Sequence, residues 1–312
     1  MISIEKYSVD VKKTWDDFVA SSKNATFLFY RDYMDYHADR FQDHSLMVFD
    51  EKRLIALFPA NIKDEIIYSH QGLTFGGLLL TERSTTTETL EIFKQICSYL
   101  KALNTKKVIY KCIPYTYYKH PSQEDLYALY RLNAQKIACN ISSAIVQTSP
   151  ISFSELRKRG VKKAIKNELD IVKYDKFDLF WKILSDNLRE KYEVDPVHSV
   201  DEITFLKNKF PENIEHYLVF TKEREPVAGT VMYLSDQVAH VQYISTTLEG
   251  RNAGALDLLF DHLVNSVYKY KTFFDFGIST EQMGHYLNEG LIFQKEGFGG
   301  RGTVYEIYEI IL

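Results

Sequence analysis

From Pro226 to Ser279 the sequence reads PVAGTVMYLSDQVAHVQYISTTLEGRNAGALDLLFDHLVNSVYKYKTFFDFGIS. Two apolar runs, a turn, an amphipathic stretch and a third apolar run follow one another, which predicts two strands, a helix and a further strand. The turn before the helix carries Arg251, Gly254 and Ala255. A helix that begins after small residues presents free backbone N–H groups and the positive end of its dipole, so this turn predicts a phosphate site.

Composition sets the frame for this block. The 312 residues suffice for two domains of ordinary size, and 45% of them are hydrophobic, so each domain can bury a core. The net charge of −4 gives no overall signature of nucleic-acid binding, and a basic site has to be local. The three cysteines, Cys97, Cys112 and Cys139, form no CxxC pair, which favours a reducing compartment and no metal site.

The sequence has no recognisable targeting or spanning segment. Its N-terminus lacks the apolar core of a signal peptide, and no apolar run approaches the about 20 residues that span a bilayer. We therefore expect a cytoplasmic protein without a transmembrane segment.

The first half of the chain contains a pattern like that of the opening block. Ser45 to Pro59 alternates apolar runs around a charged turn and predicts a hairpin, and Ile66 to His70 predicts a third strand. Thr87 to Leu103 has a helical period with Thr87 placed as its cap, and Lys107 to Ile113 returns as a strand.

The second half repeats this order. Three strands, a helix and a strand are expected at Tyr217 to Phe220, Val227 to Tyr233, Val238 to Ile244, Ala253 to Tyr268 and Thr272 to Phe276. Each copy carries a histidine with a glutamine close behind on its third strand, His70 with Gln71 and His240 with Gln242. The repeat indicates internal duplication and an α/β fold of the α+β type, with domains at residues 1–148 and 149–312.

A basic segment lies between the copies. Six cationic residues fall within the ten positions 157–166: Arg157, Lys158, Arg159, Lys162, Lys163 and Lys166. A helix here is either a solvated basic helix or a docking surface for a phosphate-bearing substrate.

A pair of helices follows, at Phe177 to Tyr192 and Asp201 to Phe210. The loop between them holds Pro196 and His198, and a proline-fixed loop of this kind is typical of elements that lie over a ligand site. The alternative is a histidine without a chemical role.

Five motifs carry a resemblance to known families: LRKRGVKKAIK (Leu156 to Lys166), AHVQYIS (Ala239 to Ser245), EGRNAGALDLLF (Glu249 to Phe260), FDFGIS (Phe274 to Ser279) and LNEGLIFQKEGFGGRG (Leu287 to Gly302). Their order resembles the acyl-CoA-binding half of the GNAT N-acyltransferase fold. Two such units joined by a basic segment resemble the FemABX group and its acyl-CoA-using relatives. The resemblance implies two tandem GNAT-like domains with a central cleft, each a mixed, mainly antiparallel sheet flanked by helices.

The match departs from the families in two places. Arg251 and Gly254 fit the GNAT phosphate loop, whereas Leu256 occupies its final small position. The helical arm that FemABX proteins often carry for tRNA is not inserted in this sequence.

The resemblance implies an acyltransferase that moves an acyl group from acyl-CoA, with acetyl-CoA expected first, to an amino group. A sugar or nucleotide-sugar acceptor in cell-surface polysaccharide biosynthesis is the expectation, because similar acyltransferase-like proteins are associated with that process. The alternatives are a FemABX-type aminoacyl-tRNA-dependent transferase that acts on a cell-wall precursor, and a non-catalytic binding protein that retains the fold.

Site residues follow from the strand and the loops. His240 is the candidate base because an imidazole titrates near neutral pH, and Tyr243 would protonate the leaving thiolate. Asp275 would orient either His240 or the acceptor amine. By alternation, His240, Gln242 and Ile244 are expected on one face of the strand. Core histidine and structural carboxylate roles are the competing interpretations.

The remaining candidates are grouped by the ligand they would hold. The cofactor would contact Ser245, Thr246, Arg251, Asn252, Gly254 and Ala255. The acceptor would contact His70, Gln71, Arg157, Lys163, His198, Lys295 and Arg301.

Overall fold

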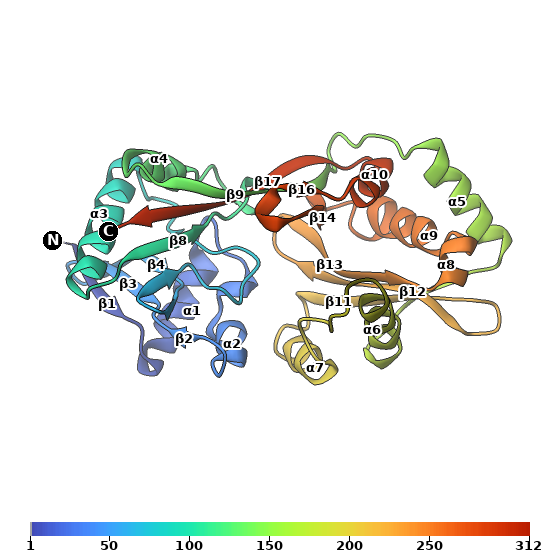
Figure 1. Cartoon of the computed structure of the whole chain (residues 1–312), viewed down its shortest axis with the longest axis horizontal. Coiled ribbons are helices and arrows are strands. Elements are labelled where there is room, and N and C mark those ends of the chain that lie inside the picture. Colours follow the sequence, from blue (N-terminus) through green and yellow to red (C-terminus); the bar gives the residue numbers. More distant parts are fainter. Residues whose placement is uncertain (1) are drawn as a thin grey trace. The chain divides into compact units, whose positions relative to one another are not determined.

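The computed structural model of the protein describes residues 2–312, apart from the side chain of Tyr192. The chain forms two compact units (Figure 1). The first comprises the chain up to Ile141 with residues 280–286 and 304–312, and the second comprises Ser142–Ser279 with residues 287–303. The last strand thus returns to the first unit, where it pairs with a strand about 200 residues earlier, a contact that no local pattern of sequence reveals.

The first unit contains two groups of strands. One sheet has the order β1 (Ile2–Lys6), β3 (Leu46–Asp50), β4 (Arg53–Phe58) and β7 (Leu79–Leu80). The other group contains β2 (Gln42–Asp43), β5 (Asn61–Lys63), β6 (Ile66–Tyr68) and β8 (Lys107–Lys111), with β6 and β8 parallel. Its helices are α1 (Lys12–Ser21), α2 (Arg31–Met34), α3 (Thr86–Ala102) and α4 (Glu124–Arg131).

Helix α3 is the main cover of this unit. Its apolar face, including Ile92, Phe93 and Leu100, packs on the buried residues of β3, β4 and β8. The helix begins one residue before the expected start, and its cap is Thr85, whose side chain accepts from the Glu88 N–H, so the expected cap at Thr87 is wrong.

The second unit contains five consecutive strands of the 11-stranded sheet that also includes β8, β6, β5 and β2, with helices on both faces of these five strands (Figure 1). Its strands follow in the order β10 (Asp170–Lys173), β11 (Ile214–Phe220), β12 (Pro226–Leu234), β13 (Val238–Thr246) and β14 (Phe273–Ile278). Neighbours are antiparallel except β13 and β14, which are parallel. The helices are α5 (Glu155–Lys166), α6 (Asp178–Tyr192), α7 (Val200–Lys209), α8 (Leu248–Ala253), α9 (Ala255–His262) and α10 (Glu289–Gly297).

Two long strands contribute residues to both units, β9 (Gln135–Val146) and β17 (Arg301–Ile311). Short elements complete the fold: 3₁₀ turns at Val9–Val11, Phe27–Phe29, Asp35–His37, Tyr115–Tyr117 and Gln282–Gly284, a π turn at Leu263–Val267, and the ribbon of β15 (Thr280–Glu281) with β16 (Tyr286–Leu287).

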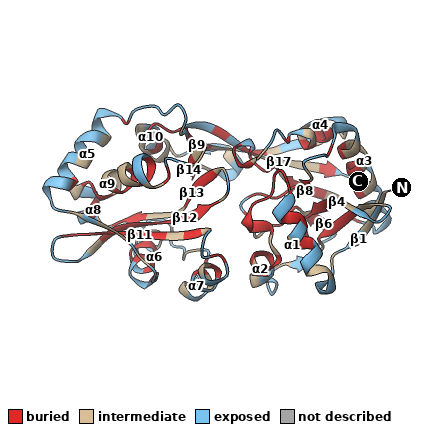
Figure 2. Cartoon of the chain, turned by 180° about the vertical axis from the view of Figure 1, so that it is seen from behind, coloured by how far each residue is buried: buried red, intermediate tan, exposed pale blue. Residues whose placement is uncertain are grey.

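The expected α+β class is confirmed, since mixed, mainly antiparallel sheets carry helices in both units. Figure 2 shows that buried residues follow the strands and the inward faces of the helices. The helix expected at Ala253 to Tyr268 is formed by α9 and the π turn that continues it, and Gly254, with a left-handed φ of 84°, separates this helix from α8. Among the described residues, no helix has both the length and the apolar character needed to cross a membrane.

Candidate functional site

The candidate site lies where strands β13 and β14 separate. They pair at three positions, Val238 with Phe273, Ala239 with Phe274 and His240 with Asp275. Beyond His240, β13 continues to Thr246 without a ladder partner on β14. Gly277 has φ of 76°, a backbone conformation that lets β14 turn aside. Unpaired backbone groups of β13 are therefore left facing the gap, where a ligand can satisfy them.

A β-bulge in β13 sets the direction of the side chains. Tyr243 pairs with Val231 and Val241 pairs with Met232, so Gln242 of β13 is an extra residue that has no paired residue on β12. An extra residue of this kind shifts the alternation of the strand by one.

The bulge overturns the expected facing of the strand. Val241 and Ile244 both pack on the apolar core beneath α9, although strict alternation would place them on opposite faces. The expectation that His240, Gln242 and Ile244 share a face is therefore wrong. His240 and Tyr243 instead come to lie on the same side of the strand, away from that core.

His240 is held by a buried carboxylate. Its Nδ1 donates to Oδ2 of Asp275 over 2.9 Å, and Asp275 is fully buried. Oδ1 of Asp275 accepts from the Ser142 hydroxyl at 2.5 Å and from the Gly277 N–H at 3.0 Å. Because an ionised carboxylate only accepts, Nδ1 carries the proton, and Nε2 is left as an acceptor without a partner among the described residues.

Lys295 of α10 fixes the end of β14. Its buried ammonium donates to the carbonyls of Gly277 and Ile278, at 2.8 and 2.7 Å. Burial lowers the pKa of Lys295 to about 8, against the opposing effect of Asp275. This ammonium stabilises the separated end of the strand and is not exposed in the way that the expected phosphate contact requires.

Tyr243 meets the loop between α6 and α7. Its hydroxyl forms a hydrogen bond with Nδ1 of His198, and its ring packs edge-on against Trp181 with centroids 5.2 Å apart. The Trp181 indole N–H donates to the His198 carbonyl at 2.9 Å. The structure thus brings together two residues, Tyr243 and His198, that the sequence assigned to different tasks.

A pocket of about 630 Å³ opens beside the end of β13. Its wall is formed by the last residues of β13, one face of α6, the junction of α8 and α9, and the start of α10. Of the expected cofactor contacts, Ser245, Thr246, Arg251, Gly254 and Ala255 line it. His240 and Asp275 are not among the residues that line it.

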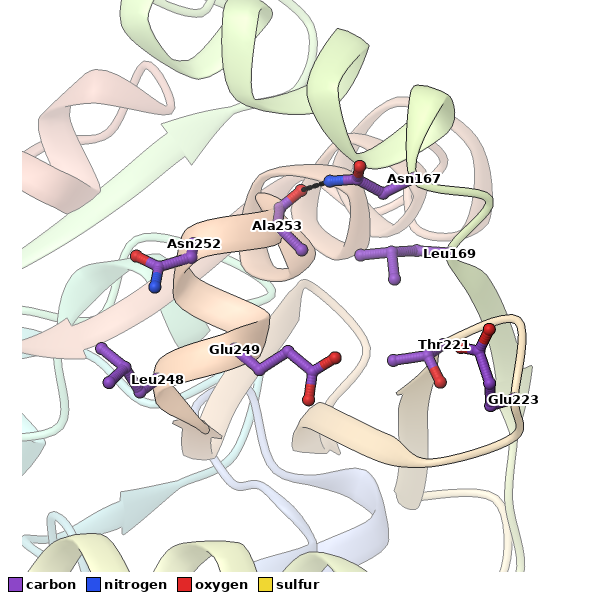
Figure 3. Close-up of a pocket in the computed structure, with 8 residues that line it drawn as sticks. All are labelled: Asn167, Leu169, Thr221, Glu223, Leu248, Glu249, Asn252 and Ala253. Atoms are coloured by element: carbon purple, nitrogen blue, oxygen red, sulfur yellow. Dashed lines mark hydrogen bonds between the residues drawn. The ribbon is translucent and has the colours of Figure 1, made fainter.

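Asn252, the sixth expected cofactor contact, lines a different pocket of about 600 Å³ (Figure 3). Asn167 donates to the Ala253 carbonyl at 3.5 Å across this second pocket. The carboxylates of Glu223 and Glu249 also line it, so its charge disfavours a phosphate.

Cations outnumber anions in the pocket beside β13. Arg157, Lys191 and Arg251 line it together with one carboxylate, Asp257. Nη1 of Arg157 donates to Oδ1 of Asp257 at 2.7 Å, which neutralises that carboxylate. Burial raises the pKa of Asp257, and Arg157 opposes the shift. The excess of positive charge suits a ligand with an anionic part.

The expected phosphate turn is closed on one side by α5. A Cβ on Gly254 would lie 2.4 Å from the Gly160 carbonyl, and a Cβ on Gly160 would lie 1.9 Å from Oδ2 of Asp257. The Gly254 N–H donates to the Arg251 carbonyl at 3.3 Å, and Asp257 places a carboxylate in the first turn of α9. Backbone donors at this turn are therefore less available to a phosphate than the sequence predicts.

The basic helix does not present one uniform face. Arg157 is turned toward the pocket, whereas Lys163 is exposed and does not line it. Lys158 pairs with Glu155 at 2.8 Å. Arg301 is exposed and donates to the Gly300 carbonyl at 2.6 Å.

In the first unit, His70 is not on a strand, because β6 ends at Tyr68 and His70 has φ of 65°. Its ring is buried and stacks on His37 with centroids 5.2 Å apart, and burial lowers the pKa of His70 to about 3. The Gln71 side chain accepts from Asn61 at 2.9 Å. His70 and Gln71, which the sequence predicted to contact the acceptor substrate, therefore make contacts that hold the loop after β6 in place.

Lys111 holds that loop in place. Its ammonium donates to the carbonyls of His70, Gln71 and Leu73, at 3.1, 3.2 and 2.7 Å. The Ser69 N–H also donates to the Ile109 carbonyl at 2.9 Å. The parallel pair of the first unit is thus followed by the chain's own loop, whereas that of the second unit is followed by a gap.

Sequence reasoning missed the contribution of α6. Leu184, Asn187, Leu188 and Lys191 line the pocket, and Asn187 donates to the Ser245 hydroxyl and the Thr246 carbonyl at 2.6 and 2.9 Å. Their i, i+3, i+4, i+7 spacing was visible in the sequence as one helical face. Only the fold shows that this face turns toward β13.

Comparison with known proteins supports the fold. No protein-family model matches the sequence, and no curated protein sequence matches it. Among solved structures, FemX has a TM-score of 0.69 at 11% identity and covers 99% of this chain and 97% of its own. The C-terminal domain (DUF2156) of a putative lysylphosphatidylglycerol synthetase from Agrobacterium fabrum has a TM-score of 0.63 at 10% identity and covers 96% and 91%.

A tandem GNAT protein from the clavulanic acid biosynthesis pathway is also similar, with a TM-score of 0.54 at 9% identity over 99% of this chain and 98% of its own. Identities this low show a shared fold and no more. The chain has the fold common to FemX and the tandem GNAT proteins.

Proposed function

We propose that this protein is a transferase that moves an acyl group from an activated donor to an amino group. The observation that carries the proposal is the separation of strands β13 and β14: a pocket lies beside the end of β13, and His240, oriented by Asp275, lies at the last pair before the strands part. A gap between strands offers unpaired backbone groups to an extended donor, and an imidazole nitrogen that keeps its lone pair suits proton removal from an amine.

Acyl-CoA is the donor that we propose first, with acetyl-CoA as the simplest case. Lys191 and Arg251 supply positive charge for its phosphates, and the pocket volume of about 630 Å³ lies in the range of ligand pockets. The tandem GNAT protein of similar fold is described in its form without AcCoA, and this mention of AcCoA is the reason to test that donor first.

In the proposed reaction the acceptor amine attacks the donor carbonyl and forms the new C–N bond. Nε2 of His240 takes the proton that the nitrogen loses, and Asp275 stabilises the resulting imidazolium. The bond to the leaving group then breaks, and the Tyr243 hydroxyl supplies the proton that this group gains. One proton is taken and one is given, so the exchange balances.

For the acceptor we propose the amino group of a sugar or nucleotide-sugar in the biosynthesis of a cell-surface polysaccharide. Support comes from the sequence resemblance alone. Of the cationic residues expected to contact the acceptor, Lys163 and Arg301 are exposed to solvent.

A second candidate donor is an aminoacyl-tRNA, as in FemABX transferases that act on a cell-wall precursor. Helix α5 favours it, because Arg159, Lys162 and Lys166 form an exposed row outside the pocket beside β13. A donor confined to that pocket does not use this row, whereas an RNA backbone would. The similarity to FemX is consistent with this second candidate.

Thermal stability in the presence of acetyl-CoA tests the proposal. A donor at 100 times its dissociation constant adds about 2.7 kcal/mol to stability, and we expect Arg251→Ala to weaken that effect while Arg224→Ala, outside the pocket, leaves it unchanged. Strongly salt-dependent binding of tRNA without any effect of acyl-CoA would transfer the assignment to the second candidate. A protein that binds neither donor would be a non-catalytic member of the fold.

A further inference from the structure

We propose that His198 is a positioning residue that relays protons to Tyr243, so that the phenol that protonates the leaving group is restored within the site. The inference rests on the proposed function. It assigns to the loop between α6 and α7 a part in the chemistry.

The first observation is the contact itself. Nδ1 of His198 forms a hydrogen bond with the Tyr243 hydroxyl, and the two rings lie nearly perpendicular, with centroids 5.8 Å apart. His198 is only 5% exposed, although its loop neighbours Val194 and Val197 are 51% and 76% exposed. The loop thus lies at the surface, but it buries this one imidazole against β13.

The second observation is that both partners are fixed from outside the contact. Trp181 donates its indole N–H to the His198 carbonyl at 2.9 Å and packs its ring against Tyr243. The next residue, Ser199, begins α7 with a capping box that includes Glu202. The backbone on each side of His198 is therefore held, and its ring has little freedom to leave the phenol.

Two charged groups of the flanking segments, Arg189 and Glu202, have partners other than His198 and Tyr243. Arg189 donates to Asp195 at 2.8 Å, and Glu202 accepts from the Ser199 N–H at 2.7 Å. The polar group of α6 nearest the end of β13 is Asn187, which does not titrate and is bonded to Ser245. Among these groups, His198 is the one that contacts the Tyr243 hydroxyl directly.

The proton path balances. When the bond to the leaving group breaks, Tyr243 gives its phenolic proton to the sulfur or oxygen that departs. The phenolate then accepts the Nδ1 proton of His198 in its imidazolium form, which leaves a neutral imidazole, and His198 recovers a proton from solvent. The bulge at Gln242 is essential to this arrangement, because it turns Tyr243 to the side of the strand that His240 occupies.

Two isosteric variants separate relay from support. His198→Asn keeps a hydrogen-bonding group near the position of Nδ1 but cannot titrate, and His198→Gln places its amide near the position of Nε2. With acetyl-CoA as donor and glucosamine as acceptor, we expect His198→Asn to lower turnover at least 10-fold with donor affinity unchanged, and Tyr243→Phe to lower it at least as much. The fall in wild-type turnover on the basic side of the pH profile should be absent from His198→Asn.

Wild-type turnover and an unchanged pH profile in His198→Asn would overturn the relay, and so would a loss confined to donor binding. Absence of transfer by the wild-type protein would instead contradict the proposed function. An NMR measurement that does not depend on turnover covers that case. The ring carbon resonance of Tyr243, assigned by its absence in Tyr243→Phe, should shift with pH as His198 titrates in the wild-type protein. The same shift should be absent from His198→Asn. A Tyr243 resonance that ignores His198 would overturn the relay by itself.

Discussion

At the scale of residues, two contacts give the second unit its chemical character. His240 on Asp275 and Tyr243 on His198 each join a strand residue to a partner that is distant in sequence. In the proposed reaction, each pair contains one group that exchanges a proton with the substrates and one that positions it. Sequence reasoning named all four residues and offered Asp275 as a group that orients His240 or the acceptor amine, whereas the pairing of Tyr243 with His198 came from the fold.

The role of His240 gives the first prediction at this scale. His240→Ala should lower turnover by about 10²-fold or more if Nε2 is the base, because alanine leaves no proton-accepting nitrogen at this position beside Asp275. Steady-state rates and far-UV circular dichroism would be measured together. His120→Ala, at an exposed histidine of the first unit, is the matched control and should be silent. Unchanged turnover in His240→Ala would remove it from the mechanism.

At the scale of elements, the junction of α5 with α8 and α9 shapes the pocket. Gly160 and Gly254 let the helices approach to backbone contact, and the ion pair of Arg157 with Asp257 closes the junction. The close approach also explains why the turn is a weaker phosphate site than its sequence predicts. A glycine was visible at each position, but the partner of each glycine was not.

Gly160→Ala tests this junction. The new methyl group would meet the side chain of Asp257 at 1.9 Å, so we expect a loss of about 1–3 kcal/mol of unfolding free energy. Gly290→Ala is the control, because a Cβ there has only one neighbour, at 3.8 Å. Urea unfolding of both variants would check the difference. Equal stability of the two would show that α5 yields to the methyl group without strain.

At the scale of the whole molecule, buried histidines link stability to pH. His70 packs on His37, and His216 packs between Phe177 and Phe180. Burial lowers the pKa of His70 to about 3 and that of His216 to about 4, in part through the cost of placing a charge among apolar rings. In the unfolded chain both titrate near about 6.5.

The sign of the effect follows from these values. Between pH about 6.5 and about 4 the unfolded chain binds more protons than the folded protein, so stability is complete above pH about 6.5 and falls as the solution is acidified. Urea midpoints measured from pH 7.5 to 4.5 should decrease, and His216→Phe should flatten part of that slope. A midpoint independent of pH over this range would contradict the burial of these two imidazoles.

The sequence by itself determined the local elements and their order. Period-2 and period-3.6 patterns, together with the turns, identified the hairpins, α3 and the chain of elements from β11 to β14, because these signals arise within a few residues. The same signals located the strand residues His240 and Tyr243 and the turn at Gly254.

Only the tertiary structure decided which residues meet. The bulge at Gln242 depends on the register between β12 and β13. The close packing of α5 against the turn at Gly254 makes that turn less accessible to a phosphate. The return of β17 to the first unit depends on its pairing with β8, a strand far away in the sequence. Each of these is set by packing and hydrogen bonding between distant segments, whose free energy no local pattern records. For the same reason, the sequence named His198 and Tyr243 separately, and the fold made them a pair.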